Sequence, residues 1–170
     1  MEDTAAPRIV VEPEYRNLDE VRRLFMEYAA SLDIDLAFQN FDDELGHLPG
    51  KYAPPKGGIY LAKSGGRTAG CVALRPFDET RCEMKRLFVR KDFRGQGIGF
   101  LLARKTLEEA AAMGYAAMLL DTLESMPEAV ALYEKMGFSR IPAYCHNPQP
   151  DAVFMEKVLG YDMPPRASAS

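Results

Sequence analysis

The feature that most constrains this chain is a glycine-rich turn between a predicted strand and a predicted long helix. The strand ends at residues 87–89, and glycine then occupies positions 95, 97 and 99. Glycine has no Cβ, so the backbone there can adopt a positive φ and approach a ligand closely. The helix expected from Ile98 leaves unsatisfied N–H groups in its first turn, at the positive end of the helix dipole. Together these features predict an anion site, best suited to the pyrophosphate of a phosphorylated cofactor.

Two common phosphate-binding loops fit this stretch less well. A Walker loop ends in Gly-Lys-Ser/Thr, whereas no lysine follows Gly99 here, which argues against a nucleotide triphosphatase. A dinucleotide-binding loop is matched by Gly95 and Gly97 and by Asp121 as a ribose contact, but Phe100 replaces its third small residue. That loop also follows a nearly apolar buried strand, and the preceding strand here carries three charges. Dinucleotide binding therefore stays open as a weaker alternative.

The turn and a second stretch downstream resemble the GNAT superfamily of acyl-CoA-dependent N-acyltransferases. The cofactor signature of that family, Arg/Gln-x-x-Gly-x-Gly/Ala, is found at residues 94–99. A second family signature lies at residues 129–138, and a predicted helix and strand separate the two. The two signatures in this order make the resemblance specific, and it covers roughly residues 8 to 158.

The resemblance implies that acetyl-CoA is the acyl donor and a co-substrate. It places the donor against the end of the strand and over the glycine-rich turn. The cofactor-binding residues expected on this basis are Leu87, Phe88, Val89, Arg94, Gly95, Gln96, Gly97, Ile98, Gly99 and Phe100. The N–H of Val89 is the candidate donor to the thioester oxygen, where it would stabilise developing negative charge.

The implied activity is that of an N-acetyltransferase, which moves an acetyl group from acetyl-CoA to a primary amine by direct attack in a ternary complex. The acceptor would be a small molecule or a peptide. Tyr133 lies where the family places its general acid, although its spacing alone indicates an apolar helix face. A phenol with a pKa of about 10 is protonated at neutral pH and can donate to the departing thiolate. A non-catalytic acyl-CoA-binding sensor is the alternative function.

Glu83 is the candidate base for the attacking amine, because some family members carry a catalytic glutamate at this position. Side chains alternate along a strand, so Glu83, Lys85, Leu87 and Val89 are expected to share one face, with Glu83 directed toward the thioester. Ordered water in place of a side-chain base is one alternative. A solvated charge on the strand surface is the other.

The loops around the acceptor end of the cleft supply the candidate substrate-binding residues. These are Phe38, Gln39, Tyr52, Tyr144 and Asn147, with ordinary loop packing as the alternative for each. One position departs from the family pattern, since many members carry an asparagine that contacts the cofactor where this chain has Met126. Asp121 and Thr122, at the end of the predicted fifth strand, are the candidates to substitute for this asparagine, and a plain strand end is the alternative for both.

The predicted fold is α/β, a central mixed sheet with helices on both faces, in the GNAT-like order β-α-α-β-β-β-α-β-α-β-β. The strands are expected at 8–11, 59–62, 69–74, 81–89, 116–120, 140–144 and 152–158, and the helices from Asn17, over 41–48, over 98–113 and from Pro127. Residues 8–159 are expected to form a single domain. A flexible N-terminus is expected at 1–7 and a disordered tail at 160–170.

The charge balance argues against two classes of partner. With 21 basic and 25 acidic residues the net charge is −4, so neither nucleic acid nor a membrane is the expected partner. A basic patch beside the turn would instead attract a phosphorylated ligand. Its members are Lys85, Arg86, Arg90, Lys91 and Arg94.

The remaining features concern compartment, metal and assembly. Three cysteines without pairing motifs, and an acidic N-terminus without a signal peptide, favour a cytoplasmic protein. His47 and His146 lie far apart and no third ligand is near either, so no metal site is expected. A monomer and a homodimer are both compatible with the sequence.

Overall fold

The computed structural model describes residues 5–32, 34–37 and 40–160. The helices are α1 (Leu18–Leu32), α2 (Phe41–Gly46), α3 (Ile98–Met113) and α4 (Pro127–Lys135). The strands are β1 (Ile9–Pro13), β2 (Gly58–Ser64), β3 (Arg67–Pro76), β4 (Arg81–Val89), β5 (Ala117–Leu123), β6 (Ser139–Ile141) and β7 (Ala152–Val158). Their order along the chain is the predicted one, with two short 3₁₀ turns added at Gly50–Tyr52 and Lys91–Phe93.

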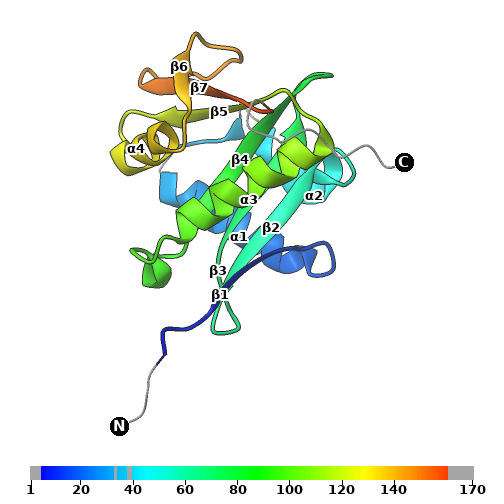
Figure 1. The fold of residues 1–170 in the computed structure, drawn as a ribbon, viewed down its shortest axis with the longest axis vertical. Coiled ribbons are helices and arrows are strands. Elements are labelled where there is room, and N and C mark those ends of the chain that lie inside the picture. Colours follow the sequence, from blue (N-terminus) through cyan, green and yellow to red (C-terminus); the bar gives the residue numbers. More distant parts are fainter. Residues whose placement is uncertain (1–4, 33, 38–39, 161–170) are drawn as a thin grey trace, which may run out of the picture.

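The strands form one mixed sheet in the order β1-β2-β3-β4-β5-β7-β6. β4 and β5 are parallel, and the other neighbouring pairs are antiparallel. α3 crosses one face of the sheet between these two parallel strands, and α1 and α2 lie behind the sheet (Figure 1). The predicted mixed sheet with helices on both faces is therefore confirmed.

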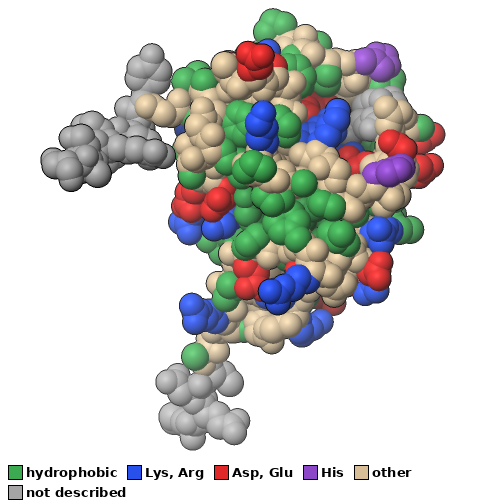
Figure 2. Space-filling model, turned by 90° about the vertical axis from the view of Figure 1, so that its right-hand side faces the viewer, with side chains coloured by type: hydrophobic (Ala, Val, Ile, Leu, Met, Phe, Trp, Pro, Cys, Tyr) green, Lys and Arg blue, Asp and Glu red, His purple; other side chains and the backbone are tan. Residues whose placement is uncertain are grey.

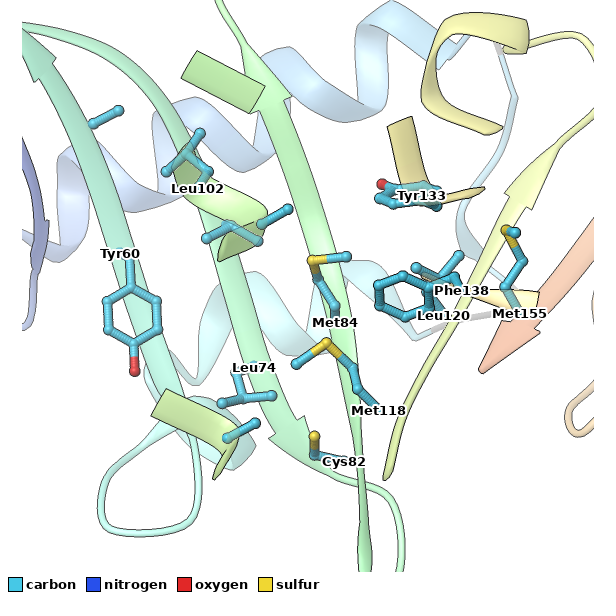
Figure 3. Close-up of a cluster of buried hydrophobic side chains, with 14 of the residues drawn as sticks. Tyr60, Leu74, Cys82, Met84, Leu102, Met118, Leu120, Tyr133, Phe138 and Met155 are labelled. Carbon is cyan, nitrogen blue, oxygen red and sulfur yellow. The ribbon is translucent and has the colours of Figure 1, made fainter. Parts of the chain in front are cut away.

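Each face of the sheet carries its own hydrophobic cluster. The α3-face cluster packs α3 and α4 against the sheet, and Figure 3 shows Tyr60, Met84, Met118 and Tyr133 within it. The α1-face cluster packs α1 and the α2 region against the opposite side of β2 and β3. Residues of both clusters alternate along β2, as expected for a strand that is buried on both sides.

Local sequence signals set several element boundaries. The Asn17 side chain accepts a hydrogen bond of 3.2 Å from the Glu20 N–H and so caps α1. Gly65 and Gly66, with φ of 58° and 81°, form the two-residue turn between β2 and β3, which requires two positive φ values. Gly114, with φ of 90°, ends α3 in the left-handed conformation that favours glycine.

β4 contains a bulge that the sequence analysis did not predict. Two of its residues, Arg86 and Leu87, lie opposite the single residue Val72 of β3. Arg86 has φ of 62°, a left-handed conformation that is uncommon for residues other than glycine. The Arg86 side chain is buried and forms an ion pair with Glu44 of α2 at 2.9 Å.

The bulge makes the predicted shared face of β4 wrong. Lys85 pairs with Ala73 of the α1-face cluster, so Lys85 and Glu83, two residues earlier, lie on the α1 face. Beyond the bulge, Leu87 and Val89 pack against the α3-face cluster. The extra residue reverses the alternation, so Glu83 and Val89 are on opposite faces of the sheet.

Other boundaries shift by a few residues. α2 ends at Gly46 instead of 48, and the loop predicted after it contains the 3₁₀ turn. β6 is shorter than the predicted strand at 140–144, so Tyr144 lies in the loop that follows it. The expected flexible N-terminus and disordered tail fall largely on residues 1–4 and 161–170, which are outside the described residues.

Gly70 of β3 lies opposite Val89 in the neighbouring strand β4, and we expect Gly70→Ala to destabilise the fold. A Cβ at this position would lie 2.4 Å from the carbonyl oxygen of Phe88. Since the clash is with backbone, the two strands must separate, and the free energy of unfolding should fall by about 2 kcal/mol. Gly46→Ala is the control, because its Cβ would meet nothing within 4 Å. Equal stability of the two variants in urea denaturation would contradict the close packing described here.

Candidate active site

The parallel strands β4 and β5 pair over only part of their length. Their register joins three residue pairs, from Arg81 with Ala117 to Glu83 with Leu119, and the strands separate beyond that point. Near the end of β4 the Arg90 N–H donates to the Ala69 carbonyl on the β3 side, at 2.8 Å. Because successive amides of a strand point to opposite edges, the Val89 N–H points toward the gap between β4 and β5.

The glycine-rich turn lies at one end of this gap. Gly95 and Gly97 have φ of 82° and 75°, which confirms the left-handed backbone that the sequence suggested. Gly97 is the N-cap residue of α3, and no side chain caps that helix. The amides of Ile98, Gly99 and Phe100 belong to the first turn of α3 and have no carbonyl acceptor within the helix, so they are available to an anion.

Only part of the predicted basic patch lies free beside this turn. Lys85 and Arg86 are buried and paired with carboxylates. Arg90 contacts Glu27 at 2.7 Å. Lys91 and Arg94 remain at the turn, and Arg94 uses its Nε to donate to the Val89 carbonyl at 3.1 Å. The expectation that all five cations attract a phosphate is therefore wrong for the three that the fold neutralises.

A small cavity of about 90 Å³ lies within the gap. Its walls come from the α1 region, from both parallel strands and from α4, and they include Tyr28, Leu87, Thr122, Met126 and Tyr133. The position that departs from the family pattern, Met126, thus still contacts the gap.

Tyr133 is the polar group of α4 that faces this cavity. Its ring packs edge-on against Phe138, with ring centroids 5.8 Å apart, and the side chain is only 7% exposed. Figure 3 shows its hydroxyl on the side of the ring that faces the strand carrying Met84. No hydrogen bond joins this hydroxyl to a described residue. Since no fully buried polar side-chain atom in the described part of the chain lacks a partner, the hydroxyl oxygen keeps some access to the cavity. Burial raises the pKa of Tyr133 above its ordinary value, so the hydroxyl keeps its proton at neutral pH.

A larger cavity of about 550 Å³ opens on the α1 face, next to the gap. It is lined by the α2 region, the end of β3, the start of β4 and the loop after β6. Both histidines of the chain, His47 and His146, line it, and Figure 2 shows them in purple near the right-hand edge of its view. Lys85 and Asp121 line both cavities, so they mark where the two meet.

Four charged side chains of alternating sign form one row in the wall of the larger cavity. Arg75 contacts Glu83 at 2.8 Å, Glu83 is 3.9 Å from Lys85, and Lys85 contacts Asp121 at 3.0 Å. Glu83, Lys85 and Asp121 have side chains no more than 6% exposed. Although burial opposes it, the Lys85 ammonium holds the pKa of Asp121 below its ordinary value.

Two of the predicted acceptor residues join this row. The Tyr144 hydroxyl donates to Glu83 at 2.6 Å, and the Asn147 amide donates to Asp121 at 3.1 Å. Burial, and then the negative charge of Glu83, raise the pKa of Tyr144, so this hydroxyl stays a donor. The alternative of a solvated surface charge at Glu83 is wrong, since the carboxylate is buried and fully engaged.

The other predicted acceptor residues are placed differently. Tyr52 lines the cavity, but its ring is 2% exposed in the α1-face cluster and its hydroxyl donates to Glu44 at 2.7 Å. Tyr52 therefore packs in the core at the cavity wall, and substrate binding by this residue stays a prediction. Phe38 and Gln39 lie outside the described residues. Sequence reasoning did not select Arg75 as a site residue, because one arginine at a strand end carries no distinguishing pattern.

No group of three or more possible metal-ligating side chains occurs among the residues that the structure describes. Within the same ranges no helix is long and apolar enough to cross a membrane.

A split between parallel strands beside an uncapped helix N-terminus offers unpaired backbone groups to an elongated, phosphorylated ligand. Residues 18–138 match the family described as Acetyltransferase (GNAT) family. The chain belongs to this family, and it is an acyltransferase.

Individual relatives agree with this assignment. An uncharacterized N-acetyltransferase of Schizosaccharomyces pombe is 43% identical over 142 residues, which are 82% of this chain and 87% of the relative. An acetyltransferase of Streptococcus agalactiae has the same fold, with a TM-score of 0.73 and 24% identity over 89% of this chain and 98% of its own. A GNAT acetyltransferase of Elizabethkingia anophelis, whose structure holds acetyl-CoA, gives a TM-score of 0.66 and 22% identity over 89% and 98% of the two chains.

Proposed function

We propose that the chain transfers an acetyl group from acetyl-CoA to a primary amine, by direct attack in a ternary complex. The observation that carries the proposal is the gap between β4 and β5. The uncapped amides of α3, the Val89 N–H and the Tyr133 hydroxyl all border it. Three free cysteines suit a reducing compartment, and we place the reaction in the cytoplasm.

The residues present fit acetyl-CoA. The first-turn amides of α3 suit its pyrophosphate, and Arg94 and Lys91 add positive charge beside them. A Cβ at Gly95 or Gly97 would meet nothing within 4 Å, so both positions border open space where a ligand can lie against the backbone. The unpaired edge of β4 at residues 87–89 offers backbone groups to the pantetheine. When bound, acetyl-CoA supplies an activated acyl thioester.

The chain would then act on three atoms. The Val89 N–H would donate to the carbonyl oxygen of the thioester and stabilise the charge that develops there. Tyr133 would donate its proton to the departing sulfur. The raised pKa of Tyr133 keeps its hydroxyl protonated and able to donate, and burial of the sulfur would raise the pKa of the thiol in the same direction.

Glu83 would receive the proton of the amine on the opposite side of the sheet from Tyr133. Arg75 contacts its Oε1, while the Tyr144 hydroxyl contacts its Oε2. Oε2 is therefore the oxygen that an amine could reach by displacing a neutral donor. Because the bulge puts Glu83 and the α4 tyrosine on different faces, the amine would attack from one side and the thiol would leave from the other.

The test is release of free thiol from acetyl-CoA by the purified protein with a panel of primary amines. We expect release that depends on the added amine, with the acetylated amine detected by mass spectrometry. Undiminished affinity for CoA by calorimetry, with no transfer to any amine, would support the sensor alternative instead. Binding of NAD(P) in preference to CoA would reject the acyl-CoA site altogether.

A further inference from the structure

The larger cavity has two cationic side chains whose N–H donors are not all used by carboxylates of the described residues. Its carboxylates all have internal partners. Glu83 is bound by Arg75, Asp121 by Lys85, Glu44 by Arg86, and Asp43 lies 3.3 Å from His47; these four pairs account for every acidic side chain that lines the cavity.

Lys51 and Arg75 are the two cations with unused donors. Lys51 is exposed at the cavity wall, and no carboxylate of the described residues lies within 4 Å of its ammonium. Arg75 directs Nε and Nη2 at a single oxygen of Glu83, and the rest of its guanidinium, on a side chain that is 24% exposed, makes no hydrogen bond to a described residue. A guanidinium with free N–H groups at a cavity wall binds carboxylates well.

We propose, on the basis of the acetyltransferase function above, that the acceptor is an aminocarboxylate such as a free amino acid. Its carboxylate binds the open side of Arg75, with Lys51 adding attraction at the wall. Its amine lies farther along the row, near Glu83 and Lys85, where the cavity meets the gap. A volume of about 550 Å³ suits such a small molecule.

A carboxylate fits better than a phosphate. The four acidic side chains in the wall are matched in number by Lys51, Arg75, Lys85 and Arg86. A zwitterion, with one charge of each sign, leaves this balance unchanged, whereas a phosphate adds further negative charge. A simple alkylamine would leave the open side of Arg75 and the Lys51 ammonium without an anion and would gain none of this attraction.

The test compares each amino acid with its own amide, since the pair differs only in the carboxylate. Glycine, alanine and phenylalanine are assayed against glycinamide, alaninamide and phenylalaninamide, with acetyl-CoA saturating. We expect kcat/KM to favour the acids by about tenfold or more. The comparison is conservative, because the amides are less basic and present more free amine at neutral pH. Phosphoethanolamine tests whether the cavity prefers a phosphate to a carboxylate, and it should react more slowly than the acids.

Lys51→Glu tests the location, and Lys56→Glu is its matched control. Lys56 is also exposed and lies five residues away, but it does not line the cavity. We expect Lys51→Glu to raise KM for the acids about fivefold and to change KM for the amides little, while Lys56→Glu changes neither. Arg75→Lys should raise KM for the acids more than Lys51→Glu does, because it removes the planar guanidinium that can hold a carboxylate through two N–H groups.

Three outcomes would overturn the inference. If the amides are acetylated as well as the acids, or better, recognition of a substrate carboxylate is rejected, while the proposed acetyltransferase function still holds. Faster acetylation of phosphoethanolamine would replace the carboxylate by a phosphate, and equal effects of the two lysine variants would place the anion elsewhere. No transfer to any of these amines, nor to the wider panel, would reject the proposed function as well.

Discussion

Replacing Tyr133 by phenylalanine is expected to lower kcat by about 10²-fold or more, with the Kd for acetyl-CoA nearly unchanged. The variant removes only the hydroxyl, which is the proposed proton donor, and general-acid assistance of this kind typically contributes 10²–10⁴-fold, as an order of magnitude. The ring and its contact with Phe138 remain, so the fold should be unaffected. Steady-state kinetics together with calorimetry of CoA separate the two quantities.

Tyr60→Phe is the matched control for this experiment. Tyr60 is another buried tyrosine of the α3-face cluster, but it does not line the gap. The kcat of Tyr60→Phe should stay within about twofold of the kcat of the unmodified protein, because the change is away from the reacting atoms. Because the raised pKa keeps Tyr133 protonated, Tyr133→Phe should lower the rate without removing a limb of the pH profile in the neutral range. An unchanged kcat would remove Tyr133 from the mechanism.

Replacing Glu44 by glutamine is expected to cost about 3 kcal/mol of stability. Glu44 accepts hydrogen bonds of 2.9 Å and 3.1 Å from Arg86, whose side chain is 1% exposed. Without the carboxylate the buried guanidinium loses the negative charge that Glu44 supplies, and breaking a buried pair from one side typically costs about 3–5 kcal/mol. The rings of Phe41 and Tyr28, at 5.0 Å and 5.8 Å from the guanidinium carbon, compensate only in part. Urea denaturation measures the loss.

Asp42→Asn makes the same chemical change on the exposed side of α2 and should cost less than about 1 kcal/mol. The double variant Glu44→Gln with Arg86→Met should lose less than the sum of its single changes, because it removes both charges. A loss for Glu44→Gln no larger than that of Asp42→Asn would show that the pair does not hold α2 to the sheet.

Regular elements with a periodic or terminal signal could be predicted from the sequence. The cap at Asn17, the turn at Gly65 and Gly66, and the helix beginning at Ile98 each depend on residues a few positions apart. The same holds for the glycine-rich turn, whose positive φ values follow from the glycines themselves. These features depend on residues that are close together in the sequence, so the sequence is enough to predict them.

The arrangement of charges in the cavity could not be predicted in the same way. The bulge at Arg86 has no sequence signal, because an arginine rarely adopts φ of 62° without tertiary support, and here that support comes from Glu44, more than forty residues away. The single extra residue moved Glu83 to the other face from Val89. Likewise the contact of Tyr144 with Glu83 joins positions 61 residues apart. The sequence named both residues as candidates without indicating that they touch.

Because the pairing between β4 and β5 ends early, part of β4 has an unpaired edge, and its position affects whether the protein aggregates. A strand edge with unsatisfied peptide groups normally recruits other polypeptides when it lies at the rim of a sheet. Here that edge is in the middle of the sheet, with β3 on one side and β7 beyond β5 on the other. The strands on both sides keep another folded chain from pairing with this edge, whereas a slender linear molecule can enter the gap. The fold therefore leaves these backbone groups unpaired for a ligand without exposing them to other protein molecules.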